Sequence, residues 1–259
     1  MIVSLIQMNS GENKKDNFSK SIRLLNQSLK DNPDIICLSE LFLYCGDKEI
    51  ENAEKLNSDI IACFKEFAKN NNVNIVLGSI ALKVEDKITN TSLVIDRNGD
   101  IVHKYDKIYM YDVEKEDIVF KESDVTVAGN KIGLFELDGI KMGVGICIDL
   151  RFPEYFRELV VNGTEIIFLP ASFRKRTGSL AWSVLTQSRA IENQVYFCAC
   201  NQTSGMGAKE RCGNSRIISY DGKILKNIEY EEGVISSNLD LNALSKYRKE
   251  FPVLKQIRK

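Results

Sequence analysis

The chain has 259 residues, a hydrophobic content of 44% and a formal net charge of −1. That content is enough for an ordinary globular core, and the near-zero charge argues against nucleic acid or an anionic membrane as a partner. The N-terminus has no basic leader, and no apolar run approaches the ~18 residues of a membrane span. Seven cysteines, an odd number that falls mostly in apolar segments, indicate reduced thiols and a cytoplasmic protein.

The first half predicts alternating strands and helices. Apolar, β-branched runs predict strands at residues 2–8, 34–38 and 73–84, and helical spacing of apolar side chains predicts helices at 15–32 and 58–71. Two further strands, 92–95 and 101–104, flank an Arg-Asn-Gly-Asp turn, which is a strong hairpin signal. Residues 105–128 are polar and irregular, and this pattern predicts a long surface loop.

The second half continues with a hairpin and a strand–helix–strand unit. An Asp-Gly turn joins strands at 134–137 and 140–148, Asp149 is expected to cap a helix, Pro153 fits its first turn, and Gly163 fits its end. The remaining elements are expected in this order: a strand at 165–169, a helix at 179–193, a strand at 194–199, a hairpin of 215–218 with 223–226, and a helix at 241–249.

The two halves resemble each other. PDIICLSELF at 33–42 aligns with TEIIFLPASF at 164–173, and the hairpin segment 90–104 aligns with 213–227. Two such units predict one domain, residues 1–259, in which two packed sheets are related by a pseudo-two-fold axis and helices lie outside. The expected fold is therefore an α/β, four-layer α-β-β-α sandwich.

Cys147 lies at the first strand–helix junction of the second half. A strand end would hold a nucleophile rigidly, and nearby helix N–H groups would lower the pKa of its thiol. A buried structural cysteine is the ordinary alternative. The single histidine, His103, excludes the usual histidine-rich zinc sites and sharply limits the possible catalytic schemes.

Three other charged residues are candidates for chemistry. Glu40 ends a buried strand and could act as a general base. Lys107 lies among tyrosines, and its ammonium group could stabilise an oxyanion. Glu122 is a further acid beside apolar residues. Each also has an ordinary explanation as a solvent-facing charge. A Cys147–His103 pair, as in a peptidase, is an alternative catalytic scheme, although a solvent-facing His103 is the simpler expectation.

Together these residues resemble the Glu-Lys-Cys hydrolases of the nitrilase superfamily, and most closely the omega-amidases. The segments that carry the resemblance are LSELF at 38–42, YDKIYMYD at 105–112, FKES at 120–123, GICIDLRFPE at 145–154, LPASF at 169–173, RAIENQVY at 189–196, GNSRIISYDGKIL at 213–225 and YRKEFP at 247–252. One departure is Ala181, which precedes Trp182 where many relatives have histidine near the rim of the site. This departure bears on the substrate.

The resemblance implies a mechanism without metal or organic cofactor. Cys147 would attack a small amide, Glu40 would shuttle its proton, and Lys107 with the backbone N–H of Ile148 would hold the oxyanion, while Glu122 would position Lys107 or Glu40. The resemblance also implies a homodimer. The helices at 154–161 and 180–193 carry more apolar side chains than one inner face needs, among them Tyr155, Phe156, Trp182, Val184 and Ile191.

A basic segment follows the equivalent strand end in the second half. Phe173, Arg174 and Arg176 are therefore candidates for substrate binding, because arginine grips a carboxylate with two parallel hydrogen bonds. A solvated basic turn is the alternative. The expected function is hydrolysis of the terminal amide of a carboxylate-bearing molecule such as α-ketoglutaramate or succinamate. An amidase for carbamoyl or neutral substrates and a non-catalytic assembly protein are the other hypotheses.

Overall fold

Two six-stranded sheets face each other in the computed structural model, which describes residues 1–115, 118–204 and 210–257. The first sheet contains, in spatial order, β14 (Gly233–Asn238), β1 (Ile2–Gln7), β2 (Ile35–Leu38), β3 (Asn74–Val84), β4 (Lys87–Ile95) and β5 (Ile101–Asp106). The second contains β13 (Ile224–Ile228), β12 (Ser215–Ile218), β11 (Tyr196–Asn201), β10 (Ile166–Ala171), β9 (Ile140–Val144) and β8 (Gly133–Leu137).

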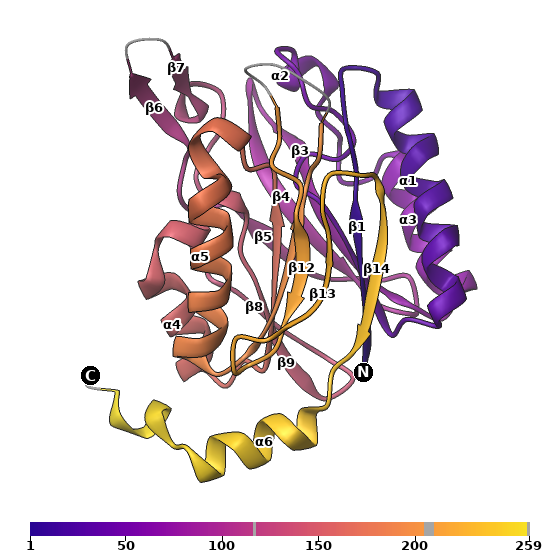
Figure 1. Cartoon of the computed structure of the whole chain (residues 1–259). Coiled ribbons are helices and arrows are strands. Elements are labelled where there is room, and N and C mark those ends of the chain that lie inside the picture. The colour runs from indigo at the N-terminus through magenta and orange to yellow at the C-terminus, as the bar shows by residue number, and fades with distance from the viewer. Residues whose placement is uncertain (116–117, 205–209, 258–259) are drawn as a thin grey trace.

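Helices cover the outer face of each sheet, and the four-layer α-β-β-α sandwich is confirmed (Figure 1). Helices α1 (Lys14–Ser28) and α3 (Asp59–Asn70) lie outside the first sheet, and α4 (Pro153–Val161) and α5 (Lys175–Asn193) lie outside the second. Helix α6 (Leu241–Glu250) runs across the end of the sandwich near the N-terminus. Short turns of helix complete the chain: η1 (Leu29–Asp31), α2 (Glu49–Asn52), η2 (Glu122–Asp124), η3 (Cys147–Arg151) and η4 (Val253–Gln256).

The two halves have the same topology. The order β1-α1-β2-α3-β3-β4-β5 repeats as β9-α4-β10-α5-β11-β12-β13, with three parallel strands followed by two antiparallel ones in each sheet. The sixth strand is also equivalent, because β14 lies antiparallel to β1 as β8 lies antiparallel to β9. The carboxyl ends of β2 and β10 therefore occupy matching positions, as the internal repeat predicts.

The core lies between the sheets and beneath the helices. One hydrophobic cluster includes Leu5 of the first sheet and Phe168 of the second, whereas Ile6, next to Leu5, belongs to another cluster with Phe64 of α3. This alternation is the period of a strand buried on both faces. Among the described residues, no helix combines the length and the apolarity that crossing a lipid bilayer requires.

Several predicted elements differ from the structure. The prediction of a surface loop at residues 105–128 is wrong. This segment contains β6 (Asp112–Lys115) and β7 (Ile118–Lys121), which pair with each other, and its Lys107 and Glu122 side chains are buried. Strand β9 ends at Val144, four residues before the predicted end, because the backbone leaves the extended conformation at Cys147, where η3 begins. Strand β14, which pairs with β1 across almost the whole chain length, was not predicted.

The prediction of surplus apolar side chains on α4 and α5 is only partly correct. Tyr155, Phe156 and Trp182 are buried in the core of the molecule itself and do not face outward. The exposed apolar side chains on these two helices are Val161, Leu180, Val184 and Ile191.

Candidate active site

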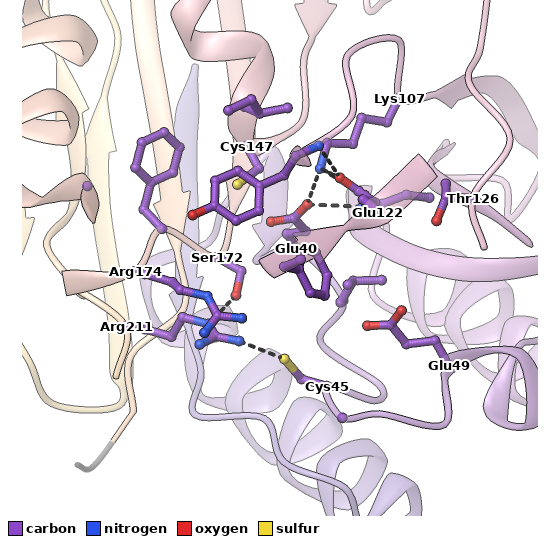
Figure 2. Close-up of a pocket in the computed structure, with 18 of the residues that line it drawn as sticks. Glu40, Cys45, Glu49, Lys107, Glu122, Thr126, Cys147, Ser172, Arg174 and Arg211 are labelled. Carbon is purple, nitrogen blue, oxygen red and sulfur yellow. Dashed lines mark hydrogen bonds and ion pairs between the residues drawn. The ribbon is translucent and has the colours of Figure 1, made fainter. Parts of the chain in front are cut away.

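Three charged side chains from three separate segments meet at the end of the sandwich that carries α2 and the β6–β7 hairpin (Figures 1 and 2). Lys107 Nζ donates to Glu40 Oε1 at 3.0 Å and to the two carboxylate oxygens of Glu122 at 3.0 and 2.8 Å. All three side chains are buried. Burial alone would lower the pKa of Lys107, but the charges of Glu122 and Glu40 outweigh it and raise that pKa well above the usual value.

Asn90 of β4 ties the two carboxylates together. Its Nδ2 donates to Glu40 Oε1 at 3.0 Å and to Glu122 Oε1 at 3.1 Å, and Glu122 also accepts from the backbone N–H of Tyr111 at 2.8 Å. Burial opposes ionisation of Glu122, yet the charge of Lys107 and these hydrogen bonds lower its pKa. Glu122 is therefore held as an anion beside a cation.

The position of Glu40 depends on both sheets. It follows β2, and its carbonyl accepts from Gln202 Nε2, after β11, at 2.6 Å. The preceding Ser39 carbonyl lies so close to Gly78 of β3 that a Cβ there would be 2.1 Å from the oxygen. Gly78 also has φ +24°, so glycine is the residue that admits this approach.

Cys147 begins η3 in a left-handed backbone conformation, with φ +50°. Such a conformation costs a non-glycine residue about 1–3 kcal/mol and is a common feature of functional sites. The predicted lowering of the Cys147 pKa is wrong. Burial and the nearby Glu40 charge raise the pKa well above its usual value, and Lys107 and a hydrogen bond from the Ser172 N–H offset this only in part. The thiol is therefore protonated near neutral pH.

Asp149 does not cap α4, contrary to the prediction, because Phe152 occupies the N-cap and Pro153 the first turn. Asp149 is instead fully buried, and its carboxylate accepts from the Ile146 N–H at 2.7 Å and from the Tyr105 hydroxyl at 2.6 Å. These bonds close the turn that presents Cys147. Burial raises the pKa of Asp149 from 3.8 to about 6, although the hydrogen bonds act in the opposite direction.

A cavity of about 120 Å³ opens beside these groups. It is lined by Glu40, Lys107, Glu122 and Cys147 together, and also by the candidate binding residues Ile148, Phe173 and Arg174. Arg176, in the first turn of α5, is exposed and is not among the lining residues. The structure thus brings together all the candidate site residues except Arg176.

The cavity has a basic wall that contains a residue the sequence did not indicate. Arg211 forms an isolated β-bridge with Arg174, and its guanidinium donates to Ser172 Oγ at 2.6 Å and to Cys45 Sγ at 3.2 Å. Arg174 lies over the ring of Phe120, 5.8 Å from the centroid. Two guanidinium groups from different segments therefore face one cavity (Figure 2).

Two residues that the sequence singled out, His103 and Ala181, do not line the cavity. His103 of β5 is not solvent-facing as predicted: it is half-buried, stacks on Phe135 with ring centroids 5.5 Å apart, and burial lowers its pKa. Ala181 is partly buried against the core, beside Trp182. In the described part of the chain, no group of three or more histidine, cysteine, aspartate or glutamate side chains is arranged to hold a metal ion.

Comparison with known proteins identifies the family. The model of the carbon-nitrogen hydrolase family matches residues 2–249. The deaminated glutathione amidase of Dictyostelium discoideum is 34% identical over 97% of this chain and 91% of its own length, and human omega-amidase NIT2 is 29% identical over 99% and 94%. The chain belongs to the carbon-nitrogen hydrolase family.

Solved structures of the nitrilase superfamily agree with this hydrolase in fold. Saccharomyces cerevisiae Nit3, a member of branch 10 of that superfamily, superposes with a TM-score of 0.90 at 25% identity, covering 100% of this chain and 97% of its own. The NitFhit protein of C. elegans superposes with a TM-score of 0.93 at 25% identity, and this chain covers 65% of its length.

Four residues in or beside this hydrolase's site were not predicted from the sequence: Asn90, Arg211, Glu49 and Asp149, which was expected to cap a helix and not to be buried. Asn90 and Arg211 lie in segments with no local signal, and only the packing of β4 and of the segment after β11 brings them to the cavity. Glu49 lies in a short, charged helix that looks solvated in the sequence. A signal for Glu49 was nevertheless present, since it lies in the stretch of chain that leads away from Glu40.

Proposed function

We propose that this carbon-nitrogen hydrolase cleaves the terminal amide of a small, carboxylate-bearing molecule, as an omega-amidase does, through a Cys147 thioester. One observation carries the proposal: Lys107 lies between the carboxylates of Glu40 and Glu122, in the same cavity as Cys147. Relatives named omega-amidase and deaminated glutathione amidase support amide hydrolysis.

In the first half of the reaction, Glu40 removes the proton of the Cys147 thiol as the sulfur attacks the amide carbonyl. A base in contact with the thiol is needed, because the raised pKa keeps that thiol protonated. The C–S bond forms, and the resulting oxyanion is held by Lys107 and the backbone N–H of Ile148. Glu40 then returns the proton to the amide nitrogen, the C–N bond breaks, and ammonia leaves a thioester.

In the second half, Glu40 removes a proton from water as the water attacks the thioester carbonyl. The C–S bond breaks, the product acid is released, and the proton returns to the Cys147 sulfur. Glu122 acts as a positioning residue, because its two oxygens hold the Lys107 ammonium that also bonds Glu40. The mechanism uses groups of this chain, the substrate and one water molecule, without a metal or an organic cofactor.

The basic wall supports a carboxylate on the substrate. Arg174 and Arg211 present two planar guanidinium groups to a small cavity, and a carboxylate can accept paired hydrogen bonds from such a group. Phe173 and the backbone of Ile148 complete this part of the wall. Arg176 has a weaker basis for the same role, because it is exposed outside the cavity lining.

The test compares ammonia release from succinamate and from a neutral amide of equal length. Arg174→Ala is expected to raise KM for succinamate roughly ten-fold or more, since a charge-assisted hydrogen bond contributes ~1.5–3 kcal/mol, and to affect the neutral amide far less. Arg176→Ala is the matched control and is expected to leave both KM values nearly unchanged. Equal effects of Arg174→Ala on both substrates, or a wild-type preference for the neutral amide, contradict a carboxylate clamp.

We further propose that residues 1–259 act as one domain, in a cytoplasmic homodimer. The exposed apolar side chains of α4 and α5 support pairing with a second copy. All seven cysteines are free thiols, which supports a reducing compartment. No nucleic acid or membrane partner is proposed, given the net charge of −1.

A further inference from the structure

Glu49 is an acid in the cavity that the proposed mechanism does not use. It is the first residue of α2, it is half-buried, and its carboxylate points into the cavity (Figure 2). Among the residues that the structure describes, Glu49 accepts no side-chain hydrogen bond and makes no ion pair. Its neighbour Glu51 faces outward and lies 3.9 Å from Lys48.

An unpartnered carboxylate in this place is unfavourable. Burial raises the pKa of Glu49 from 4.5 to about 7, and the negative charges of Glu122, Glu40 and Asp47 add to the rise, while Lys107 opposes it. Both effects disfavour the ionised form, and a ligand that donates hydrogen bonds or carries positive charge would relieve both. The site is therefore suited to a cation beside Glu49.

The arginines lie on the other side of the cavity. Figure 2 shows Arg174 and Arg211 on one side of the view and Glu49 on the other, with Cys147 and the Glu40–Lys107–Glu122 group above them. A small molecule in this cavity thus meets positive charge on one side and negative charge on the other. A substrate with only carboxylates would complement one wall and be repelled by the other.

We propose that Glu49 binds a protonated amine on the substrate, so that the preferred amide is of the amino-acid type and carries both a carboxylate and an ammonium group. This inference rests on the proposed function, because it assumes that Cys147 attacks an amide in this cavity. It extends that function from the carboxylate to a second charged group and assigns Glu49 as a specificity-determining residue.

The role of Glu49 predicts opposite pH trends of KM for amides with and without an amine. An ammonium group is attracted by ionised Glu49, so KM for an amino-bearing amide is expected to fall as the pH rises through about 7. The same amide without the amine meets growing repulsion, and its KM is expected to rise. The other charged or titratable groups that line the cavity with Glu49 are Glu40, Cys45, Asp47, Lys107, Tyr111, Glu122, Cys147, Arg151, Arg174 and Arg211.

Matched substrate pairs and a matched variant distinguish the effect of Glu49 on KM from the effects of those other groups. Glutamine and glutaramate differ only in the amine, as do asparagine and succinamate, and all four release ammonia. Glu49→Gln keeps the size of the side chain and removes its charge. It is expected to lower kcat/KM for the amino member relative to the other member by ten-fold or more, and to abolish the opposite pH trends. Glu51→Gln, on the exposed side of the same helix, is expected to change neither.

The outcomes are distinct. A wild-type enzyme that cleaves succinamate and glutaramate but shows the same pH trend for both members of each pair overturns the role of Glu49 and leaves the amidase proposal standing. An equal effect of Glu49→Gln on both members also overturns it, and the residual turnover of glutaramate reports that the variant is folded. Failure of the wild type to release ammonia from any of the four amides overturns the amidase proposal and this inference together.

Discussion

At the scale of single residues, the proposed nucleophile is a protonated thiol, and the proposed base beside it is held in place by hydrogen bonds. Burial and the Glu40 charge keep the Cys147 thiol neutral, so sulfur attack and proton removal are coupled. Glu40 receives hydrogen bonds from Lys107 and Asn90 on one carboxylate oxygen, which fixes its orientation. Cys147 and Glu40 are thus expected to act as one catalytic unit.

Glu40→Gln and Cys147→Ala are each expected to lower kcat by several orders of magnitude, because the first removes the base and the second removes the nucleophile. His103→Ala and Cys63→Ala are the matched controls. His103 stacks on Phe135 outside the cavity lining and Cys63 is exposed on α3, so neither change should matter for turnover. Ammonia release from succinamate measures all four, and circular dichroism checks their folding.

A loss of activity in His103→Ala with retention in Glu40→Gln would instead favour a Cys/His mechanism. Retained activity in Cys147→Ala would remove the thioester altogether. These four variants therefore distinguish the proposed mechanism from the peptidase-like alternative.

At the scale of elements, local sequence patterns predicted most of the strands and helices, but not β6, β7 and β14 and not the burial of charge. Residues 105–128 are polar, and polar segments usually face water, yet Lys107 and Glu122 are buried because each neutralises the other. The pairing partner of such a group lies in a distant segment, here Glu40 after β2, and no local pattern reveals it. Glu40 and Cys147 were predictable because each ends a strong apolar run.

The turn that presents Cys147 depends on Asp149, whose raised pKa gives stability a pH dependence. The pKa of Asp149 is about 6 in the folded protein and 3.8 ordinarily, so the folded state binds the proton more tightly. The free energy of unfolding contributed by Asp149 is therefore greatest below about pH 4 and falls as the pH rises to about 6, by roughly 3 kcal/mol.

Asp149→Asn is expected to destabilise the protein at acidic pH. Its amide oxygen can accept from Ile146 and Tyr105, which both donate to one carboxylate oxygen, but its NH2 group then faces the Tyr109 N–H, which donates to the other. An NH2 group cannot accept this bond, whereas the oxygen of a protonated carboxyl can. The difference in unfolding free energy between wild type and variant should shrink by up to roughly 3 kcal/mol between about pH 4 and pH 7, since only the wild type buries a charge there. Urea unfolding at several pH values measures it, with exposed Asp86→Asn as the control. A difference that grows with pH would show that the hydrogen bonds outweigh burial.

At the scale of the whole molecule, the internal repeat predicted the two sheets and their pseudo-two-fold relation. It could do so because the carboxyl ends of β2 and β10 must match if the halves share a topology, and this match places the Arg174 segment near Glu40. Strand β14 could not be predicted from the repeat or from its local sequence pattern. It lies over 200 residues from its partner β1, and all but two of its residues, Val234 and Ile235, are polar or glycine.

The outer face of the second half leads to the last prediction, a homodimer. Leu180, Val184 and Ile191 are 79%, 52% and 51% exposed, and their spacing places them along one face of α5. Val161 of α4, 58% exposed, adds to this outer layer. Clustered apolar side chains on a helix layer are typical of an interface between copies, because pairing about a two-fold axis buries the same patch on both subunits.

Replacing Leu180 and Val184 together by glutamate is expected to convert the dimer to a monomer at micromolar concentration, since four charges would have to be buried in one interface. Leu56→Glu is the matched control, because Leu56 is 49% exposed before α3, away from this face, and should leave the assembly intact. Light scattering measures the mass of all three proteins. A monomeric wild type, or a double variant that remains dimeric, would show that α5 does not form the interface.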